Sequence, residues 1–154
     1  MVTPLSQPET INRLLDAVYP AFALLAGMEL DVWTPLKDGP LTAEQLAENL
    51  EVHAGKLKPL LYTLVVAGLL AVEEGVFSNT AETGQYLVRG RPDYLGGQYE
   101  LTKSNWRRIL KTAETVRTGG LPEMIDYHAP SQEELVALFR GLNPGVLKDA
   151  EQLM

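Results

Sequence analysis

The sequence contains no cysteine and only two histidines, His53 and His128. Without cysteine the chain cannot build a disulfide framework, a thiolate nucleophile, a zinc ribbon or an iron–sulfur site. Two histidines leave little material for a histidine-based metal centre, so no metal site is expected. Positive charge is also scarce, because 13 lysines and arginines stand against 20 aspartates and glutamates, a net charge of −7. This acidic balance argues against nucleic acid as the main partner.

Long apolar runs are missing as well. The longest nearly apolar run, residues 18–28, is too short for a membrane span and contains Pro20 and Gly27. The first residues show no basic region followed by an apolar one, so no signal peptide is predicted and a cytoplasmic protein is expected. With 154 residues, 45% hydrophobic and 21% charged, the chain has the composition of one globular domain.

What the chain does contain is mostly helical periodicity, beginning with two apolar segments separated at Pro20. Proline is expected to break or kink a helix. The segment after it, residues 21–33, is apolar nearly all round, which predicts burial on most sides. In a chain of this length such a helix is either central to the domain or part of a subunit interface. The segment before Pro20 has apolar residues at helical spacing, namely Ile11, Leu14, Leu15 and Val18.

The middle of the chain predicts two helices followed by a β-hairpin. Thr42 and Gln45 fit a capping box at the start of the first helix. The second helix is predicted over residues 54–67, with a clean apolar stripe. Residues 70–77 then alternate around a glycine turn, as a hairpin does, and a short helix over 81–88 follows. This order of elements is typical of a winged helix-turn-helix.

The last part of the chain predicts helices. A long helix is expected over residues 94–118, with Gly119 at its end. Ser131 and Glu134 fit a second capping box, and Pro144 can open a final helix. The expected fold class is therefore mainly α, a winged helix with a small hairpin wing, extended by helices at both ends. The stripe expected to bury the long helix consists of Trp106, Ile109, Leu110, Ala113 and Val116.

A winged helix raises the possibility of DNA binding, but the charges disagree. Between residues 41 and 90 there are three basic side chains and six acidic ones. The hairpin turn carries Glu73 and Glu74, which would repel phosphate, and the exposed face of the second helix offers little beyond Lys56 and Lys58. A DNA-reading domain needs a basic footprint there. The segment is therefore interpreted as a protein-packing scaffold, and nucleic acid is not the expected partner.

Catalytic and cofactor-binding patterns are poor. No serine sits on a strand-to-helix elbow, and no glycine-rich loop joins a strand to a helix. The Gly96-Gly97 and Gly119-Gly120 pairs are flanked by predicted helices, so they are interpreted as helix breaks. His128, beside Tyr127, is interpreted as a loop residue. The chain itself is expected to hold no catalytic residue and no cofactor-binding residue.

Several short strings nevertheless occur in a distinctive order. A proline-led apolar helix runs into Met28-Glu-Leu-Asp-Val, and Leu41-Thr-Ala-Glu-Gln-Leu-Ala follows. Leu64-Val-Val-Ala-Gly-Leu-Leu comes before the hairpin, and Thr118-Gly-Gly ends the long helix. Together these strings resemble the N-terminal dimerisation domain of class I S-adenosylmethionine-dependent small-molecule O-methyltransferases, over essentially the whole chain. Members of this family methylate caffeic acid, hydroxyindoles and bacterial polyketides.

The resemblance implies a helix-rich homodimer in which the N-terminal helices pack on those of the partner. Residues 1–90 would form the dimerisation helices and winged helix, and residues 91–154 a helical lid and linker. The S-adenosylmethionine site and the catalytic residues would belong to a following Rossmann-like domain, so this chain alone is expected to be inactive. The dimer-interface candidates are Leu15, Val18, Tyr19, Phe22, Leu25, Met28 and Trp33.

The resemblance also implies that part of the acceptor pocket lies in this chain. In the family, the helices before the catalytic domain form a lid over the substrate, and the first helices of the partner reach it. Glycines replace the bulky side chains that narrow the pocket of the plant enzymes, and Asn143 replaces an apolar residue. The pocket candidates are Tyr19, Phe22, Gly96, Gly97, Gln98, Thr102, His128, Leu135, Phe139 and Asn143.

Three functions are compatible with these patterns. The first is the homodimerisation and substrate-lid domain of an O-methyltransferase acting on a small aromatic or polyketide-like hydroxyl. The second is a stand-alone dimeric winged-helix regulator, for which the acidic charge is the weak point. The third is a methyltransferase-like scaffold domain of a biosynthetic megaenzyme.

Overall fold

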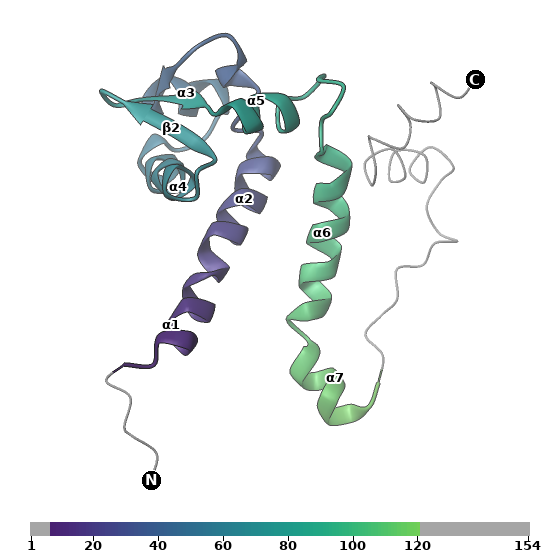
Figure 1. Cartoon of the computed structure of the whole chain (residues 1–154). Helices are drawn as coiled ribbons and strands as arrows, with labels where there is room; N and C mark the ends of the chain where they lie inside the picture. Colours follow the sequence, from purple (N-terminus) through teal and green to yellow (C-terminus); the bar gives the residue numbers. More distant parts are fainter. Residues whose placement is uncertain (1–6, 121–154) are drawn as a thin grey trace, which may run out of the picture. The chain divides into compact units, whose positions relative to one another are not determined.

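The computed structural model describes residues 7–120. Within this range only the backbone is described for five residues of one helix, namely Gln98, Glu100, Leu101, Ser104 and Arg107. The chain divides into two compact units, Met1–Gly84 and Gln85–Met154. No helix in the described range is long and apolar enough to cross a membrane. The elements are α1 (Glu9–Asp16), α2 (Val18–Leu30), a 3-10 turn (Pro35–Lys37), β1 (Leu41–Thr42), α3 (Ala43–Asn49), α4 (Ala54–Val66), β2 (Leu70–Glu73), β3 (Val76–Asn79), α5 (Ala81–Tyr86), α6 (Gly96–Ile109) and α7 (Thr112–Thr118) (Figure 1).

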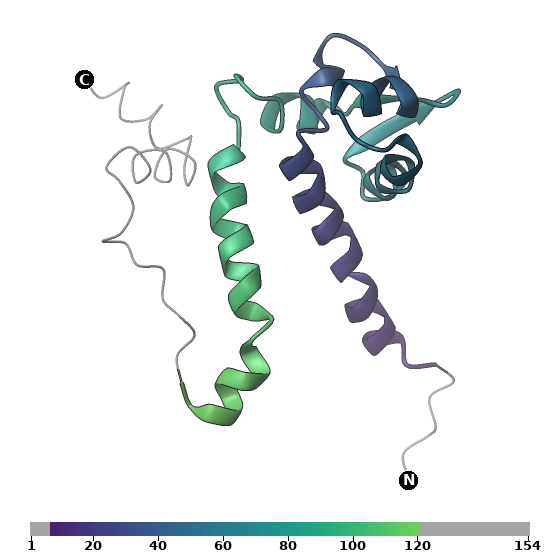
Figure 2. The same cartoon turned by 180° about the vertical axis from the view of Figure 1, so that it is seen from behind.

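The helices α1 and α2, here called the N-terminal arm, follow one another away from the sheet, as opposite views show (Figures 1 and 2). α1 ends at Asp16, four residues before Pro20. Proline has no N–H to donate to the carbonyl of Asp16, so the helix is interrupted there. Pro20 itself lies in the first turn of α2, where the helix does not need its N–H. The expected break is present, but placing it at Pro20 was wrong.

The C-terminal end of α2 is a tight left-handed turn. Asp31 has φ 59° and ψ 47°, and the N–H of Val32 donates to the carbonyl of Gly27 over 3.0 Å. This geometry satisfies the last carbonyls of the helix and reverses the chain. The predicted helix over 21–33 therefore ends too late, because the structure places Val32 and Trp33 beyond its end.

Trp33 joins the arm to the rest of the first unit. Its indole N–H donates to the carbonyl of Leu69 over 3.1 Å, and the side-chain amide of Asn79 donates to the Trp33 carbonyl over 3.0 Å. The indole lies so close to Gly27 that a Cβ there would be 2.6 Å from Cη2 of the ring. With 1% of its surface exposed, Trp33 fixes the end of α2 against the segments that flank the hairpin.

The helices α3 and α4 form the centre of the first unit. The predicted capping box is confirmed, because the Thr42 hydroxyl accepts from the N–H of Gln45 and the Gln45 side chain accepts from the N–H of Thr42. α4 packs on both α2 and α3. The buried apolar side chains of the first unit are Ala23, Val32, Trp33, Leu36, Ala43, Leu46, Ala47, Leu57, Leu61, Leu64, Leu70 and Phe77.

A three-stranded antiparallel sheet completes the first unit. β2 and β3 form the predicted hairpin, with Val72 opposite Phe77 and the left-handed residues Glu74 and Gly75 in the turn. β1 pairs with the other edge of β3, placing Leu41 opposite Phe77, and gives the order β1-β3-β2. Two residues are too few for a recognisable alternation, so β1 was not predicted. The mainly helical fold with a small sheet is confirmed.

The second unit contains α6 and α7, and the prediction of one helix over 94–118 was wrong. The N–H of Lys111 bonds to the carbonyl of Arg108, three residues back, and the Thr112 hydroxyl donates to the carbonyl of Ile109 over 2.6 Å. These bonds tighten and interrupt the helix. Gly119 ends α7 with φ 69°, as predicted.

The expected burial of the long helix was also wrong for its distal part. Ile109 is 58% exposed, Leu110 is 73% exposed and Val116 is 79% exposed. The proximal part of α6 differs, because Tyr99 is 8% exposed. α6 and α7 therefore carry apolar side chains at helical spacing that the described part of the chain does not cover.

Candidate dimerisation surface

The first helix of the arm is not covered by the described part of the chain. Each of its eight residues is exposed, and none is buried. Ile11 is 61% exposed, Leu14 58% and Leu15 63%, although their spacing places them on one face. A surface helix normally turns such a face toward its own core. α1 therefore has an amphipathic sequence without the packing that amphipathic helices receive.

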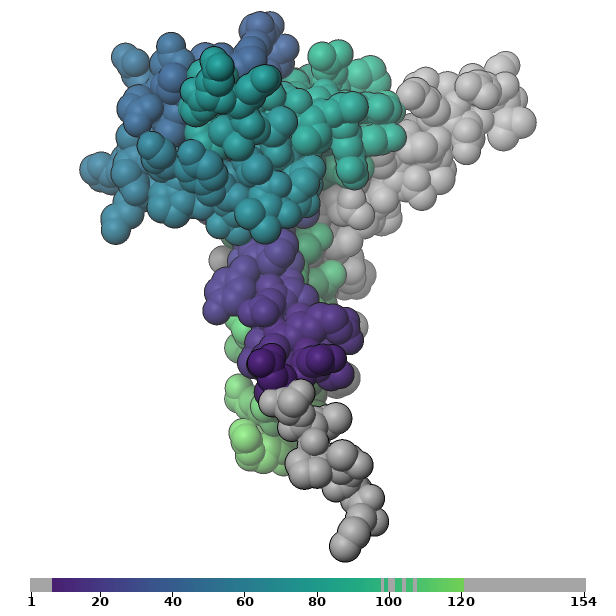
Figure 3. Space-filling view, turned by 60° about the vertical axis from the view of Figure 1, so that its left-hand side comes forward, coloured from purple at the N-terminus to yellow at the C-terminus, as the bar shows by residue number. Residues whose placement is uncertain are grey.

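The apolar surface continues along α2. Val18 is 40% exposed, Tyr19 68% and Phe22 40%, whereas Ala23 and Gly27 face inward and are buried. The buried side of α2 packs against α4. The space-filling view shows the arm as a projection from the rounder remainder of the first unit (Figure 3). Monomeric proteins rarely expose contiguous apolar surface of this kind.

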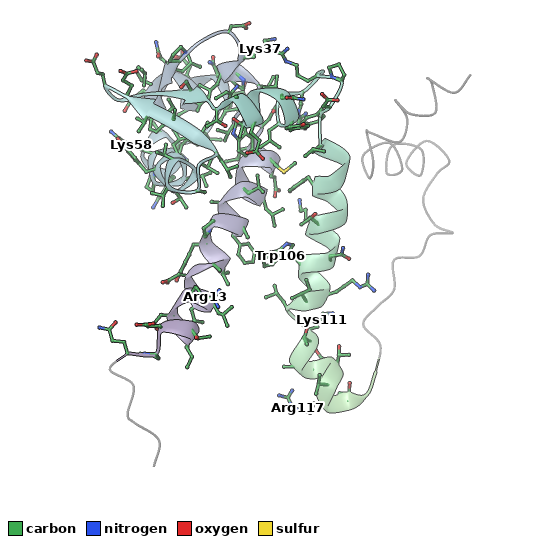
Figure 4. All side chains as sticks on the ribbon, in the orientation of Figure 1. Arg13, Lys37, Lys58, Trp106, Lys111 and Arg117 are labelled. Atoms are coloured by element: carbon green, nitrogen blue, oxygen red, sulfur yellow. The ribbon has the colours of Figure 1, made fainter. Side chains whose placement is uncertain are left out.

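The opposite side of α1 is polar. Glu9, Arg13 and Asp16 follow one another at spacings of three and four residues, so they share one face of the helix. Arg13 projects from α1 toward solvent (Figure 4). A helix with one apolar and one charged face can pack against a partner while its other side stays hydrated. The arm therefore has the amphipathic character of an association helix.

The seven predicted interface residues fall into three groups. Leu15, Val18, Tyr19 and Phe22 are exposed on the arm. Leu25 and Met28 are half-buried on α2. Trp33 is 1% exposed and lies in the core of its own subunit, so its surface is already occupied by Gly27 and neighbouring segments.

The predicted pocket residues are only partly within the described range. Tyr19 and Phe22 share the exposed face of α2. Gly96 and Gly97 open α6, and Thr102 is half-buried one turn and a half further on, but the side chain of Gln98 is not described. A Cβ on Gly96 would meet the ring of Tyr94, so a side chain at this position would require that ring to move. His128, Leu135, Phe139 and Asn143 lie outside the described residues, as does Tyr127.

The side of α4 that would face DNA in a winged-helix reader is poorly suited to phosphate. Lys56 and Lys58 are exposed, and Lys58 projects outward (Figure 4). Tyr62 and Val66 on the same helix are 44% and 87% exposed, and the ring of Tyr62 packs edge-on against Phe77 at 5.4 Å. This mixed apolar surface lacks the basic footprint that a DNA reader needs.

The described residues also do not fit an S-adenosylmethionine site. A dinucleotide-type or methyl-donor cradle needs a parallel strand, a glycine-rich loop and a helix N-terminus. Within residues 7–120 the sheet is antiparallel, and β3 leads directly through Thr80 into α5. The same range contains no cluster of three or more histidine, cysteine, aspartate or glutamate side chains able to hold a metal ion.

The exposed apolar surface of the arm extends beyond the predicted interface candidates. Ile11, Leu14 and Leu30 are 61%, 58% and 36% exposed, but they were not among the candidates. The helical spacing of Ile11 and Leu14 with Leu15 was the signal that could have identified them. No signal in the sequence showed that Trp33 would fold back on Gly27, because that depends on the left-handed turn at Asp31.

A small helical domain whose amphipathic arm is exposed along one face belongs to the class of association domains. Comparison with known families gives the same answer: residues 12–89 match the model of the O-methyltransferase dimerisation domain. The match covers about half of the chain, and the chain belongs to this family.

Curated relatives of the chain include methyltransferases of Streptomyces species. The tetracenomycin polyketide synthesis 8-O-methyl transferase TcmO of Streptomyces glaucescens is 33% identical over 117 residues, 73% of this chain and 34% of TcmO. A 3-hydroxy-5-methyl-1-naphthoate 3-O-methyltransferase of Streptomyces sahachiroi is 30% identical over 72% of this chain and 32% of that enzyme. The chain therefore spans about a third of the length of these relatives.

Solved structures show the same fold in larger proteins. The mitomycin 7-O-methyltransferase MmcR superimposes with a TM-score of 0.73 and 24% identity, over 94% of this chain and 46% of MmcR. Human N-acetylserotonin methyltransferase, solved in complex with S-adenosylmethionine, superimposes with a TM-score of 0.66 and 22% identity, over 92% of this chain and 44% of that one.

Proposed function

We propose that this chain is the homodimerisation region of an S-adenosylmethionine-dependent O-methyltransferase, and that the N-terminal arm is its association surface. The observation that carries the proposal is the arm itself, because α1 has no buried residue while its apolar face is about 60% exposed. Burying the exposed remainder of such a side chain stabilises an association by about 1–2 kcal/mol. The family match to a dimerisation domain supports a second copy of the chain as the partner.

We further propose that α3, α4 and the hairpin act as a winged-helix scaffold that holds the arm. Trp33 supports this role, since it bonds to Leu69 just before β2 and to Asn79 at the end of β3, and packs on α2. The domain boundary is proposed near residue 90. The donor would be bound by sequence other than the described residues, whose antiparallel sheet offers no cradle for it.

The proposed acceptor is a small aromatic or polyketide-like molecule with a hydroxyl group. The names of the relatives, which include a polyketide O-methyltransferase and a naphthoate O-methyltransferase, support this class. Residues 91–154 are proposed as the lid over the acceptor. The acceptor pocket would be lined by residues of the lid and of the arm. The proposed lining residues are Tyr19, Phe22, Gly96, Gly97, Gln98, Thr102, His128, Leu135, Phe139 and Asn143.

The arm can be tested with a pair of charge-matched variants. Leu15→Asp places a carboxylate on the apolar face of α1, whereas Arg13→Gln changes the net charge by the same amount on the polar face. We expect Leu15→Asp to weaken dimerisation at least about tenfold, the loss of one buried leucine contact. Arg13→Gln should leave the dimer dissociation constant within about twofold, as surface charges usually do.

Sedimentation velocity over a range of concentrations measures both constants. Because no residue of α1 is buried, neither substitution should change the urea unfolding of the monomer. Equal dimer dissociation constants for Leu15→Asp and the unmodified chain would contradict the role of the arm.

A further inference from the structure

The turn before β1 contains an aspartate followed directly by a glycine, Asp38-Gly39. This is the only place in the 154-residue sequence where an aspartate or an asparagine precedes a glycine. The backbone nitrogen of the following residue can attack such a side chain, and glycine hinders that attack least because it has no side chain. Asp38 is exposed, and its neighbour Lys37 lies at the outer edge of the first unit (Figure 4).

Backbone hydrogen bonds distinguish Asp38 from the other described aspartates. The attacking nitrogen belongs to the residue after the aspartate, and after Asp16, Asp31 and Asp93 its N–H already donates to a carbonyl. These bonds run from Ala17 to Arg13 over 3.1 Å, from Val32 to Gly27 over 3.0 Å and from Tyr94 to Arg91 over 3.1 Å. Within residues 7–120 the N–H of Gly39 makes no such bond. Attack by this nitrogen therefore breaks no backbone hydrogen bond of the fold.

The surroundings of the Asp38-Gly39 peptide leave room for it to move. Asp38 has φ −98° and ψ −5°, so the peptide has to turn before its nitrogen reaches Cγ of Asp38. Gly39 has φ 153°, and nothing lies within 4 Å of a Cβ built on it. The carboxylate of Asp31, in contrast, accepts a hydrogen bond from the Thr34 hydroxyl over 2.6 Å. The peptide after Asp38 can thus turn into open space.

We propose that Asp38 is a modification site, at which the folded chain isomerises aspartate to isoaspartate. The Gly39 nitrogen bonds to Cγ of Asp38 and closes a succinimide ring. One carboxyl oxygen leaves as water, with the amide proton and the proton of the acid form of the carboxyl. Water then attacks the backbone carbonyl carbon of Asp38 and breaks its bond to the ring nitrogen. The chain now runs through Cβ and Cγ, its composition is unchanged, and the reaction needs no further reagent.

The product lengthens a short connection that is fixed at both ends. Leu36, before the turn, is 3% exposed, and Leu41, after it, pairs with Phe77 in the sheet. Isoaspartate adds one methylene to the backbone between them. Thr42, the second residue of β1, also caps α3. We therefore expect the isoaspartate form to unfold at a lower temperature, and this inference does not rest on the proposed function.

Peptide mapping of the full chain after several weeks in warm, neutral heavy-oxygen water tests the site. Chymotrypsin, used in ordinary water, cleaves after Trp33 and so separates Asp31 from Asp38. We expect the Asp38 peptide to gain heavy oxygen and to yield a labelled form that elutes apart from the original. The peptides of Asp31 and Asp93 should stay unlabelled. Asp38→Glu keeps the charge but lengthens the side chain, so labelling of this peptide should be lost.

Parallel samples in urea separate the effect of the fold from that of the sequence. Labelling of the Asp38 peptide in the folded chain, at a rate close to that in urea, supports the inference. Labelling in urea alone would show that the turn protects Asp38, and equal labelling of Asp38→Glu would place the reaction elsewhere; either result overturns the inference.

Thermal unfolding of the same incubated samples tests the consequence for the turn. The midpoint should fall for the unmodified chain and stay constant for Asp38→Glu. An unchanged midpoint in a sample rich in isoaspartate would overturn the expected effect on β1. Neither the labelling nor the midpoint comparison depends on whether the arm joins two subunits, so the proposed function can fail without affecting them.

Discussion

Gly27 is the residue on which the attachment of the arm depends most directly. A Cβ at this position would lie 2.6 Å from Cη2 of Trp33 and 3.3 Å from Cδ1 of Leu64. The indole cannot move away cheaply, because it is 1% exposed and bonded to the carbonyl of Leu69. The glycine is needed here for close approach rather than for an unusual backbone conformation.

We therefore expect Gly27→Ala to destabilise the chain by about 1–3 kcal/mol, the usual cost of overpacking a core. Urea unfolding followed by tryptophan fluorescence would measure this change. Gly55→Ala is the matched control, since Gly55 is also helical but has nothing within 4 Å of the added Cβ. It should be neutral or stabilise by up to about 1 kcal/mol. Similar losses for both variants would contradict the proposed contact.

At the scale of single elements, the hairpin turn stores strain that can be relieved. Glu74 has φ 49° and Gly75 has φ 83°, so both central residues of the turn are left-handed. Glycine adopts this conformation freely, but glutamate does not, and asparagine is preferred before glycine in such turns.

Replacing Glu74 with asparagine should stabilise the chain by roughly 0.5–1 kcal/mol, part of the cost of a left-handed residue other than glycine. Thermal unfolding followed by circular dichroism would detect a higher midpoint. Glu73→Gln removes an equal charge next to the turn, at a residue within β2, and serves as the control. A rise in midpoint of the same size for Glu73→Gln would assign the gain to charge instead of backbone strain.

The elements that the sequence predicted correctly are those with a local chemical cause. The capping box of Thr42 and Gln45 and the hairpin around Gly75 are set by interactions within a few residues, so their patterns were sufficient. β1 was missed because it is a strand only through pairing with β3, some 35 residues later in the sequence. The end of α2 was missed because the left-handed residue that ends it is Asp31. A glycine there would have signalled the end of the helix, but an aspartate does not.

The prediction of a single helix over 94–118 failed because local spacing cannot show where a helix is interrupted. Its apolar spacing continues through the break, so periodicity alone cannot reveal the interruption by Thr112. Burial was assigned to Ile109, Leu110 and Val116 because apolar spacing says that a face is to be covered. Periodicity does not say whether the cover is the same chain or another one. The same ambiguity allowed residues 21–33 to be read as a central helix or as an interface.

At the scale of the whole molecule, the candidate site within the described residues is the exposed apolar surface of the arm. The pattern of the sequence identified the arm, but only the structure distinguishes exposed Leu15 and Tyr19 from half-buried Met28 and buried Trp33. Within residues 7–120 there is no cluster of side chains able to hold a metal ion and no strand–glycine loop–helix step. The exposed apolar arm is the feature of the described residues that suits them to joining subunits.

The central claim is that two copies of this chain associate through uncovered apolar helices, and sedimentation equilibrium of the unmodified chain tests it most directly. Measurements at several loading concentrations and at about 0.15 M salt, where long-range repulsion between the acidic subunits is screened, give the mass without labels. The account predicts twice the mass of one chain at micromolar concentration, with dissociation on dilution. A single-chain mass at every concentration up to the solubility limit would contradict it.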